Sequence, residues 1–258
     1  MNPQRFLALA GLGSRRACDA LIREGRVTVN GAILEFGIQI DDGDLVCVDG
    51  SRIGEIAPTQ YIALNKPHGL ISDHGIPRAK SALDLPGLPR GLHAVGRLDK
   101  DATGLLLLTN DGDLSFRLAH PSFEHEKEYR VLVEGVPSHQ TLEAWRQGIL
   151  LDGTLTSKAR VTSLPAAPQL PDEHLALPVR AAVHREPSGA ATWLQVILRE
   201  GRKRQIKKVA KLLGHPVRSL VRVRIGTLEL GGLRPGAWRH LDPSEIARLR
   251  NDEVKEAI

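Results

Sequence analysis

Two carboxylates stand directly before the most apolar run of the chain. Asp99 and Asp101 lie in GRLDKDATGLLLLTNDGDL, residues 96–114, and four leucines, 105–108, follow them. Closely spaced carboxylates can bind a cation, share acid–base work or supply a nucleophile. A short apolar run bounded by turn residues is typical of a buried strand. The pattern therefore indicates an acid held at the end of a rigid strand, with Thr103 and Gly104 setting the turn into it.

Three chemistries can be compared with this spacing. A calcium loop beginning at Asp99 would need a bidentate Glu at its twelfth position, which is Asn110, so that interpretation fails. A phosphate-binding loop would need a GK[ST] ending that residues 96–104 lack. A glycosidase pair needs two acids placed across a sugar ring, which sequence alone does not test. An ion pair of Arg97 with Asp99 that only caps the strand stays open at this point.

The composition limits the class of protein. The 258 residues include 35 Lys and Arg against 30 Asp and Glu, and the pI is about 9.4. This balance fits either a nucleic-acid partner or an enzyme that happens to be basic. Cys18 and Cys47 lack the spacing of zinc ligands, and two thiols in this length favour a reducing compartment. Because no apolar run approaches about 18 residues, we expect a cytoplasmic protein with no membrane contact.

The first fifty residues form a self-contained pattern. Ser14 is a candidate N-cap for a helix that ends at Gly25, and residues 26–34 predict a hairpin around Asn30-Gly31. A third apolar stretch, residues 45–48, completes a helix–hairpin–strand unit. Its polar side carries four arginines, which we expect to contact RNA phosphates in preference to a merely solvated surface: Arg15, Arg16, Arg23 and Arg26.

The remaining elements follow after a linker at residues 50–60. Strands are expected at residues 61–67, 105–109, 126–135, 192–200 and 217–230. Helices are expected from 114, at 138–148, at 202–213 and after Asp242, where Pro243 and Glu245 match an N-terminal capping pattern. Residues 72–93 and 163–190 are expected to be loops. Few regular βαβ repeats occur, so we predict an α+β fold with a mixed, mainly antiparallel sheet, preceded by a small N-terminal α/β unit.

Five segments in order resemble the pseudouridine synthases of ribosomal RNA. Residues 96–114 resemble that family's signature segment, and the other four are LNKPHG at 64–69, KEYRV at 127–131, EGRKRQIKK at 200–208 and SLVRVRIG at 219–226. The N-terminal unit is similar to a small RNA-binding domain first described in a ribosomal small-subunit protein. The resemblance implies domains at residues 1–49 and 61–250, joined by the linker 50–60.

The resemblance also implies roles for individual residues. Asp99 would be the catalytic carboxylate, which attacks the ribose or assists elimination, and Lys207 would keep it ionised and oriented. Tyr129 would stack on the target base, although a core-facing tyrosine is a serious alternative. Arg97 would help hold the nucleotide outside its helix, and Leu220 would pack under the base. Asp101 is expected to be structural or solvent-facing.

The implied reaction isomerises a uridine within ribosomal RNA, more in keeping with the large-subunit than the small-subunit enzymes. A non-catalytic RNA-binding ribosome-assembly protein is the alternative. The reaction needs no redox change, metal or energy donor, so we expect no cofactor and a monomer whose partner is ribosomal RNA. A second basic patch, on the segment around 202–211, is expected to bind RNA through Arg202, Lys203, Arg204 and Lys208.

Overall fold

The computed structural model describes residues 1–13, 15–35, 37–53, 58–73, 79–166 and 190–251, without the side chains of Arg15 and Arg16. Two compact units are present. The smaller comprises residues 1–60, 89–93 and 109–112, and the larger comprises 61–88, 94–108 and 113–258. Among the described residues, no helix is both long and apolar enough to cross a bilayer.

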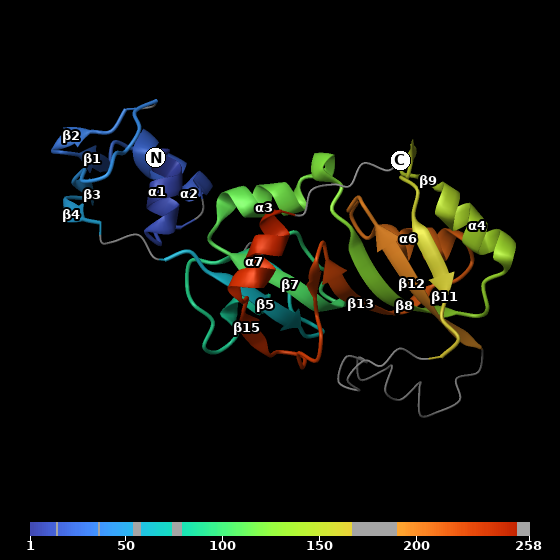
Figure 1. The fold of residues 1–258 in the computed structure, drawn as a ribbon. Helices are drawn as coiled ribbons and strands as arrows, with labels where there is room; N and C mark the ends of the chain where they lie inside the picture. The colour runs from blue at the N-terminus through green and yellow to red at the C-terminus, as the bar shows by residue number, and fades with distance from the viewer. Residues whose placement is uncertain (14, 36, 54–57, 74–78, 167–189, 252–258) are drawn as a thin grey trace. The chain divides into compact units, whose positions relative to one another are not determined.

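The smaller unit packs two helices against a small sheet (Figure 1). The sheet order is β2-β1-β3-β4, and the bounds are α1 (Pro3–Leu9), α2 (Arg15–Arg23), β1 (Val27–Val29), β2 (Ala32–Ile33), β3 (Val46–Val48) and β4 (Ser51–Arg52). Asn30 and Gly31 both have positive φ, 52° and 84°, which confirms the predicted two-residue hairpin. Helix α1 was not predicted, although Asn2 caps it by accepting a hydrogen bond from the Arg5 backbone N–H at 3.2 Å.

A mixed nine-stranded sheet forms the larger unit. Its main order is β11-β12-β8-β13-β7-β5-β15, with β14 paired to β13 and β6 to β7. The strands are β5 (Tyr61–Lys66), β6 (His93–Val95), β7 (Thr103–Thr109), β8 (Lys127–Glu134), β11 (Arg160–Ser163), β12 (Ala191–Leu198), β13 (Val217–Ile225), β14 (Leu228–Glu229) and β15 (Trp238–His240). Strand β8 runs antiparallel to β12 and β13, whereas β13 runs parallel to β7. The α+β prediction with a mixed, mainly antiparallel sheet is therefore confirmed.

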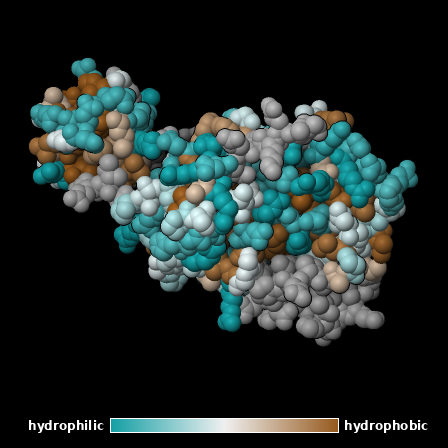
Figure 2. All heavy atoms as spheres, in the orientation of Figure 1, coloured by the Kyte–Doolittle hydropathy of each residue, from teal (hydrophilic) through white to brown (hydrophobic). Residues whose placement is uncertain are grey.

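Both faces of this sheet are buried. Neighbouring residues Leu220 and Val221 of β13 belong to different apolar clusters, so each face has its own core. All seven residues of β7 are buried, and Leu105 to Leu108 have no exposed surface. A strand covered on both faces needs no polar alternation, which explains the leucine run. On the face drawn in Figure 2, hydrophilic side chains predominate over the surface of the larger unit.

Short helices complete the larger unit. They are α3 (Gly112–Ala119), α4 (His139–Gln147), α6 (Gln205–Leu212), α7 (Pro243–Arg250) and the 3-10 turns η1 (Ala82–Asp84) and η2 (Pro121–Phe123). Helix α7 has the predicted capping box, since Asp242 and Glu245 each accept a hydrogen bond from the other's backbone N–H.

Several element boundaries differ from the predictions. Helix α6 begins at Gln205 instead of 202, because Arg204 has φ +55° and no side-chain cap precedes the helix. Thr103 and Gly104 do not form a turn but are the first residues of β7. The predicted strand 217–230 divides at Gly226, where β13 turns back into β14. The hairpin of β9 (Leu150–Leu151) and β10 (Thr154–Leu155), strand β11 and η1 were not predicted.

Two predicted features fall on residues outside the described ranges. Ser14, the candidate cap of α2, is one of them. Residues 167–189, most of the predicted long loop, are the other.

Candidate active site

A cavity of about 630 Å³ opens in the larger unit near the N-terminal end of β7, which Asp99 and Asp101 precede. Asp99, Tyr129, Arg97 and Leu220 all line it, so the structure brings together four residues separated by up to 123 positions. Three basic residues of the segment before α6 also line the cavity: Arg202, Lys203 and Arg204.

The segment that carries Asp99 is held by bonds on both sides. The Ser72 hydroxyl donates to the Leu98 carbonyl at 2.9 Å and accepts from the Leu98 N–H at 3.0 Å. The Gly69 N–H donates to the Lys100 carbonyl at 2.8 Å, and the Ala102 N–H to the Asp99 carbonyl at 3.1 Å. These contacts fix the backbone around the acid before any ligand arrives, as catalytic geometry requires.

Lys207 lies beside both carboxylates. Its ammonium is 3.7 Å from Asp99 Oδ2 and donates a closer hydrogen bond to Asp101 Oδ1. The lysine side chain is only 14% exposed, whereas that of Asp99 is 31% exposed. A cation this close stabilises an ionised carboxylate and limits its orientation.

The Asp101 side chain is half exposed, and Asp101 is the principal partner of Lys207. Burial would raise the pKa of Asp101, yet the hydrogen bond and charge of Lys207 outweigh that effect and lower it. Arg204 adds a second cation, 4.0 Å from Asp99 and 3.9 Å from Asp101. Its left-handed backbone is the kind of local strain that clusters at functional sites.

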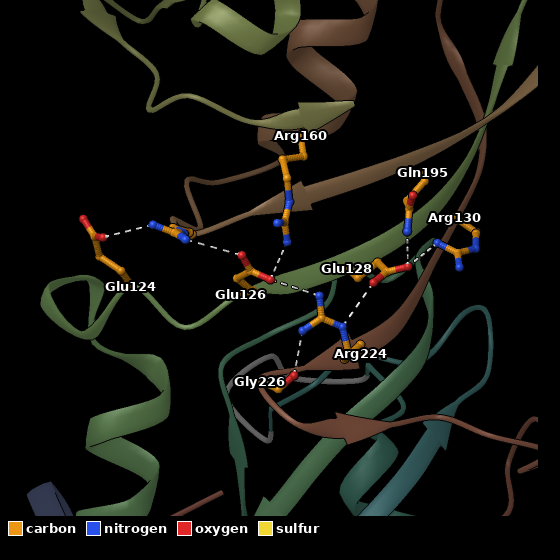
Figure 3. Close-up of polar contacts among 9 residues, drawn as sticks. Glu124, Glu126, Glu128, Arg130, Arg160, Gln195, Arg224 and Gly226 are labelled. Carbon is orange, nitrogen blue, oxygen red and sulfur yellow. Dashed lines mark hydrogen bonds and ion pairs between the residues drawn. The ribbon is translucent and has the colours of Figure 1, made fainter. Parts of the chain in front are cut away.

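Tyr129 is both a core residue and a cavity residue. It is 9% exposed and belongs to the apolar cluster that contains Leu220, so the two alternatives weighed from sequence are not exclusive. Its neighbours on β8, Glu128 and Arg130, belong to the ion-pair network of Figure 3. Arg224 bridges Glu128 and Glu126, each at 3.1 Å.

This network extends from Arg224 of β13 across β8 to β12 and β11. Gln195 of β12 donates to Glu128 at 2.7 Å, and Arg160 of β11 pairs with Glu126 at 2.7 Å (Figure 3). Burial would raise the pKa of Glu128, but the hydrogen bonds from Gln195, Arg130 and Arg224 lower it. These hydrogen bonds fix the register of β8 and thereby the position of Tyr129.

Arg222, a buried cation at the cavity, was not among the predicted site residues. Its Nε donates to the Leu105 carbonyl at 2.8 Å and its Nη1 to the Arg97 carbonyl at 3.4 Å. It therefore ties β13 to β7 and to the backbone before Asp99, while the Arg97 side chain stays exposed. The available signal was an arginine flanked by Val221 and Val223 in the strand-forming segment SLVRVRIG.

Lys66, which is buried, and Lys127, which is half-buried, also lie at the site. The Lys66 ammonium has no exposed surface and donates to the carbonyls of Pro67, Leu70 and Lys100 at 3.0, 2.7 and 3.4 Å. Burial lowers the pKa of Lys66 to about 8, against the opposing charges of Asp101 and Asp99. Burial, followed by the charge of Arg222, likewise lowers the pKa of Lys127 to about 8.

The basic residues predicted to contact RNA have different surroundings. Arg202 donates to Glu200 and to the carbonyls of Thr154 and Leu155, so its guanidinium holds the β9–β10 hairpin. Lys208 pairs with Asp152 at 2.5 Å. Lys203 is exposed at the cavity.

In the smaller unit, Arg23 pairs with Asp19 at 3.0 Å and stays 69% exposed. Arg26 donates two hydrogen bonds to Asp49, at 2.9 and 2.6 Å, and also forms an ion pair with Glu24. The side chains of Arg15 and Arg16 lie outside the described residues.

Most of the chain matches two known protein families. Residues 60–211 match the RNA pseudouridylate synthase family, and residues 4–46 match the S4 domain. The chain belongs to the RNA pseudouridylate synthase family. The resemblance, the enzyme class and the presence of an N-terminal S4 RNA-binding domain are thus confirmed.

Named relatives cover nearly all of this synthase. It is 34% identical over 252 residues to the ribosomal large subunit pseudouridine synthase B of Bacillus subtilis (strain 168), spanning 96% of this chain and 94% of the relative. The protein of the same name from Pseudomonas aeruginosa is also 34% identical, over 96% of this chain and 61% of the relative. A solved pseudouridylate synthase has a TM-score of 0.62 at 29% identity, covering 96% of this chain and 99% of that one, which supports the fold.

Proposed function

We propose that this synthase converts a specific uridine of large-subunit ribosomal RNA to pseudouridine and that Asp99 is the carboxylate that starts the reaction. The observation that carries the catalytic part is the position of Lys207, 3.7 Å from Asp99 at the cavity that Tyr129 also lines. The target is inferred from the names of relatives that match almost the whole chain. The division into residues 1–49, 50–60 and 61–250 is part of the same proposal.

The reaction breaks the bond from uracil N1 to ribose C1′, turns the base and joins its C5 to the same carbon. Asp99 either adds to C1′ or assists elimination from the ribose, and each route uses an ionised carboxylate. Lys207 and Arg204 lie within 4.0 Å of it and favour that form. The uracil stays bound after the bond from N1 to C1′ breaks. Once C5 has joined C1′, C5 releases its proton to solvent and N1 gains a proton, so substrate and product are isomers.

Other cavity residues bind and orient the nucleotide in this proposal. A uridine inside a helix is unreachable, so the target must be turned out of its stack at a cost of a few kcal/mol. Tyr129 stacks on the uracil, Leu220 packs beneath it, and the exposed guanidinium of Arg97 supports the everted nucleotide. The S4 domain supplies a second RNA-binding surface.

Tritium release from ribosomal RNA transcripts labelled at uridine C5 tests this proposal. Wild-type protein should release tritium from the large-subunit transcript, and Asp99→Asn should lower kcat by at least about 1000-fold with RNA binding retained. Asp101→Asn is the matched control, because Asp101 shares Lys207 but does not line the cavity. We expect that variant to stay within about tenfold of wild type.

Each other outcome has a definite meaning. An active Asp99→Asn beside an inactive Asp101→Asn would transfer the catalytic role to Asp101. Release from the small-subunit transcript alone would reject the proposed target. RNA binding without release from any ribosomal transcript would favour the non-catalytic alternative.

A further inference from the structure

A row of aromatic rings lies on α3 and η2 of the larger unit. Phe116 and His120 have ring centroids 4.9 Å apart at an interplanar angle of 38°, and Phe123 meets the Phe116 ring edge-on at 5.9 Å. The buried His125 ring stacks on the Phe123 ring, with their centroids 6.4 Å apart. We name Phe116, His120 and Phe123 the aromatic ledge.

The exposure of Phe116 is unusual for this chain. Only nine of the 258 residues are Phe, Tyr or Trp, and both tyrosines are buried. Among the described members of that group, only Phe116 is exposed, with 57% of its surface accessible. Leu114 and Leu118 are the buried residues of α3, so the helix packs against the core without this ring. The ring therefore adds little to the packing of α3.

The ledge is continuous with the cavity. Ala119 and Pro121 both line the cavity, and His120 lies between them in the chain. Ser122 holds the His120 ring through a 2.7 Å hydrogen bond to Nδ1, and the His120 side chain in turn caps η2. Rings held by a short turn lose little freedom when a flat ligand stacks on them.

We propose that the aromatic ledge is a stacking platform for an unpaired RNA base next to the target uridine. The inference rests on the proposed function, because a nucleotide in the cavity must have neighbours that leave it along its rim. Any base presents a π-face to a ring, so such a platform tolerates different sequences. Sequence-specific RNA recognition commonly uses unpaired bases stacked on aromatic side chains.

The charges near the ledge fit a nucleic-acid occupant. Arg117 is exposed on the same helix turn, and Arg199 and Lys203 line the neighbouring cavity. Asp113, Glu124 and Glu126 are acidic side chains close in sequence. Arg199 offsets two of them, at 3.9 Å from Glu124 and 3.6 Å from Glu126. Cations beside flat rings are the combination that single-stranded RNA requires, whereas a protein partner would not need the row to run into the cavity.

The test uses the full-length protein and Phe116→Ala, whose exposed position leaves the core intact. Filter binding to a large-subunit ribosomal RNA transcript gives Kd, and tritium release gives KM and kcat. We expect Kd and KM to rise about tenfold, within the roughly 5- to 150-fold range for one stacked base, with kcat unchanged. Phe116→Trp should restore both. Leu150→Ala is the matched control, since Leu150 is 67% exposed and does not line the cavity.

An oligouridylate and an abasic oligomer of the same length separate stacking from other contacts. The wild type should bind the oligouridylate more tightly than Phe116→Ala does, and the two proteins should bind the abasic oligomer equally. If wild type and Phe116→Ala bind each oligomer and the transcript with equal affinity, the proposed stacking of a base on the aromatic ledge is overturned. A contact with a protein partner would then be the remaining role for the exposed ring. If wild type fails to release tritium while Phe116→Ala still loses base-dependent binding, the proposed function fails and the ledge stands.

Discussion

Gly104 is the position at which one methyl group should damage the site's framework most. It lies in the parallel pairing of β7 with β13, where Gly104 is opposite Arg222. A Cβ on Gly104 would lie 2.3 Å from the carbonyl oxygen and 2.7 Å from the nitrogen of Arg222, and the residue has φ +100°. Backbone cannot yield as a flexible side chain would, so Gly104→Ala must separate the two strands.

The magnitude follows from two contributions. The positive φ costs an alanine roughly 1–2 kcal/mol, and forcing a methyl into a close-packed contact costs roughly 1–3 kcal/mol. We expect the free energy of unfolding to fall by about 2–5 kcal/mol. With a slope of about 2 kcal/mol per molar, the urea midpoint should fall by roughly 1–2.5 M.

Tryptophan fluorescence during urea unfolding reports on the larger unit, which contains Gly104. All three tryptophans lie in that unit: Trp145, Trp193 and Trp238. Gly236→Ala is the control, since Gly236 has φ +81° but no atom within 4 Å of an added Cβ. It should lose only the conformational part, about 1–2 kcal/mol. Equal midpoints for the two variants would refute the reasoning from strand contact.

Two further predictions concern the cations at the site. The pKa of Lys66 is about 8 in the folded chain and near 10.4 when unfolded, so the unfolded chain binds more protons between those values and the free energy of unfolding rises with pH there. Lys66→Met should reduce this rise in urea titrations from pH 8 to 10; an identical pH dependence would contradict the burial argument. Lys203→Gln should weaken RNA binding and lower the slope of log K against log salt by about 0.7–1, whereas Arg202→Gln should leave the slope unchanged and destabilise the β9–β10 hairpin. Equal changes in slope would show that Arg202 also contacts phosphate.

Local patterns predicted the elements that depend on neighbouring residues. The Asn30-Gly31 hairpin, the leucine strand β7 and the capping box of α7 each depend on residues within a few positions of one another. The acidic pair before β7 was recognised from the local pattern, whereas the resemblance selected Asp99 from that pair and supplied Tyr129 and Lys207.

Partners distant in sequence were not predictable in this way. Lys207 prefers Asp101 to Asp99, and Arg222 reaches the carbonyl of Leu105, because the fold brings 97–105 against 204–222. Gly104 was taken for a turn residue, since a glycine in sequence does not reveal that another strand's backbone lies against it. The start of α6 was also predicted wrongly, because Arg204 has a left-handed backbone that its residue type does not favour.

A pseudouridine map of ribosomal RNA tests the central claim most directly. The map would be made from cells that lack the gene, complemented with wild type or with Asp99→Asn. The account predicts that one large-subunit pseudouridine disappears, returns with wild type and stays absent with Asp99→Asn at equal protein level. Restoration by Asp99→Asn, or a map that the gene does not change, would contradict it.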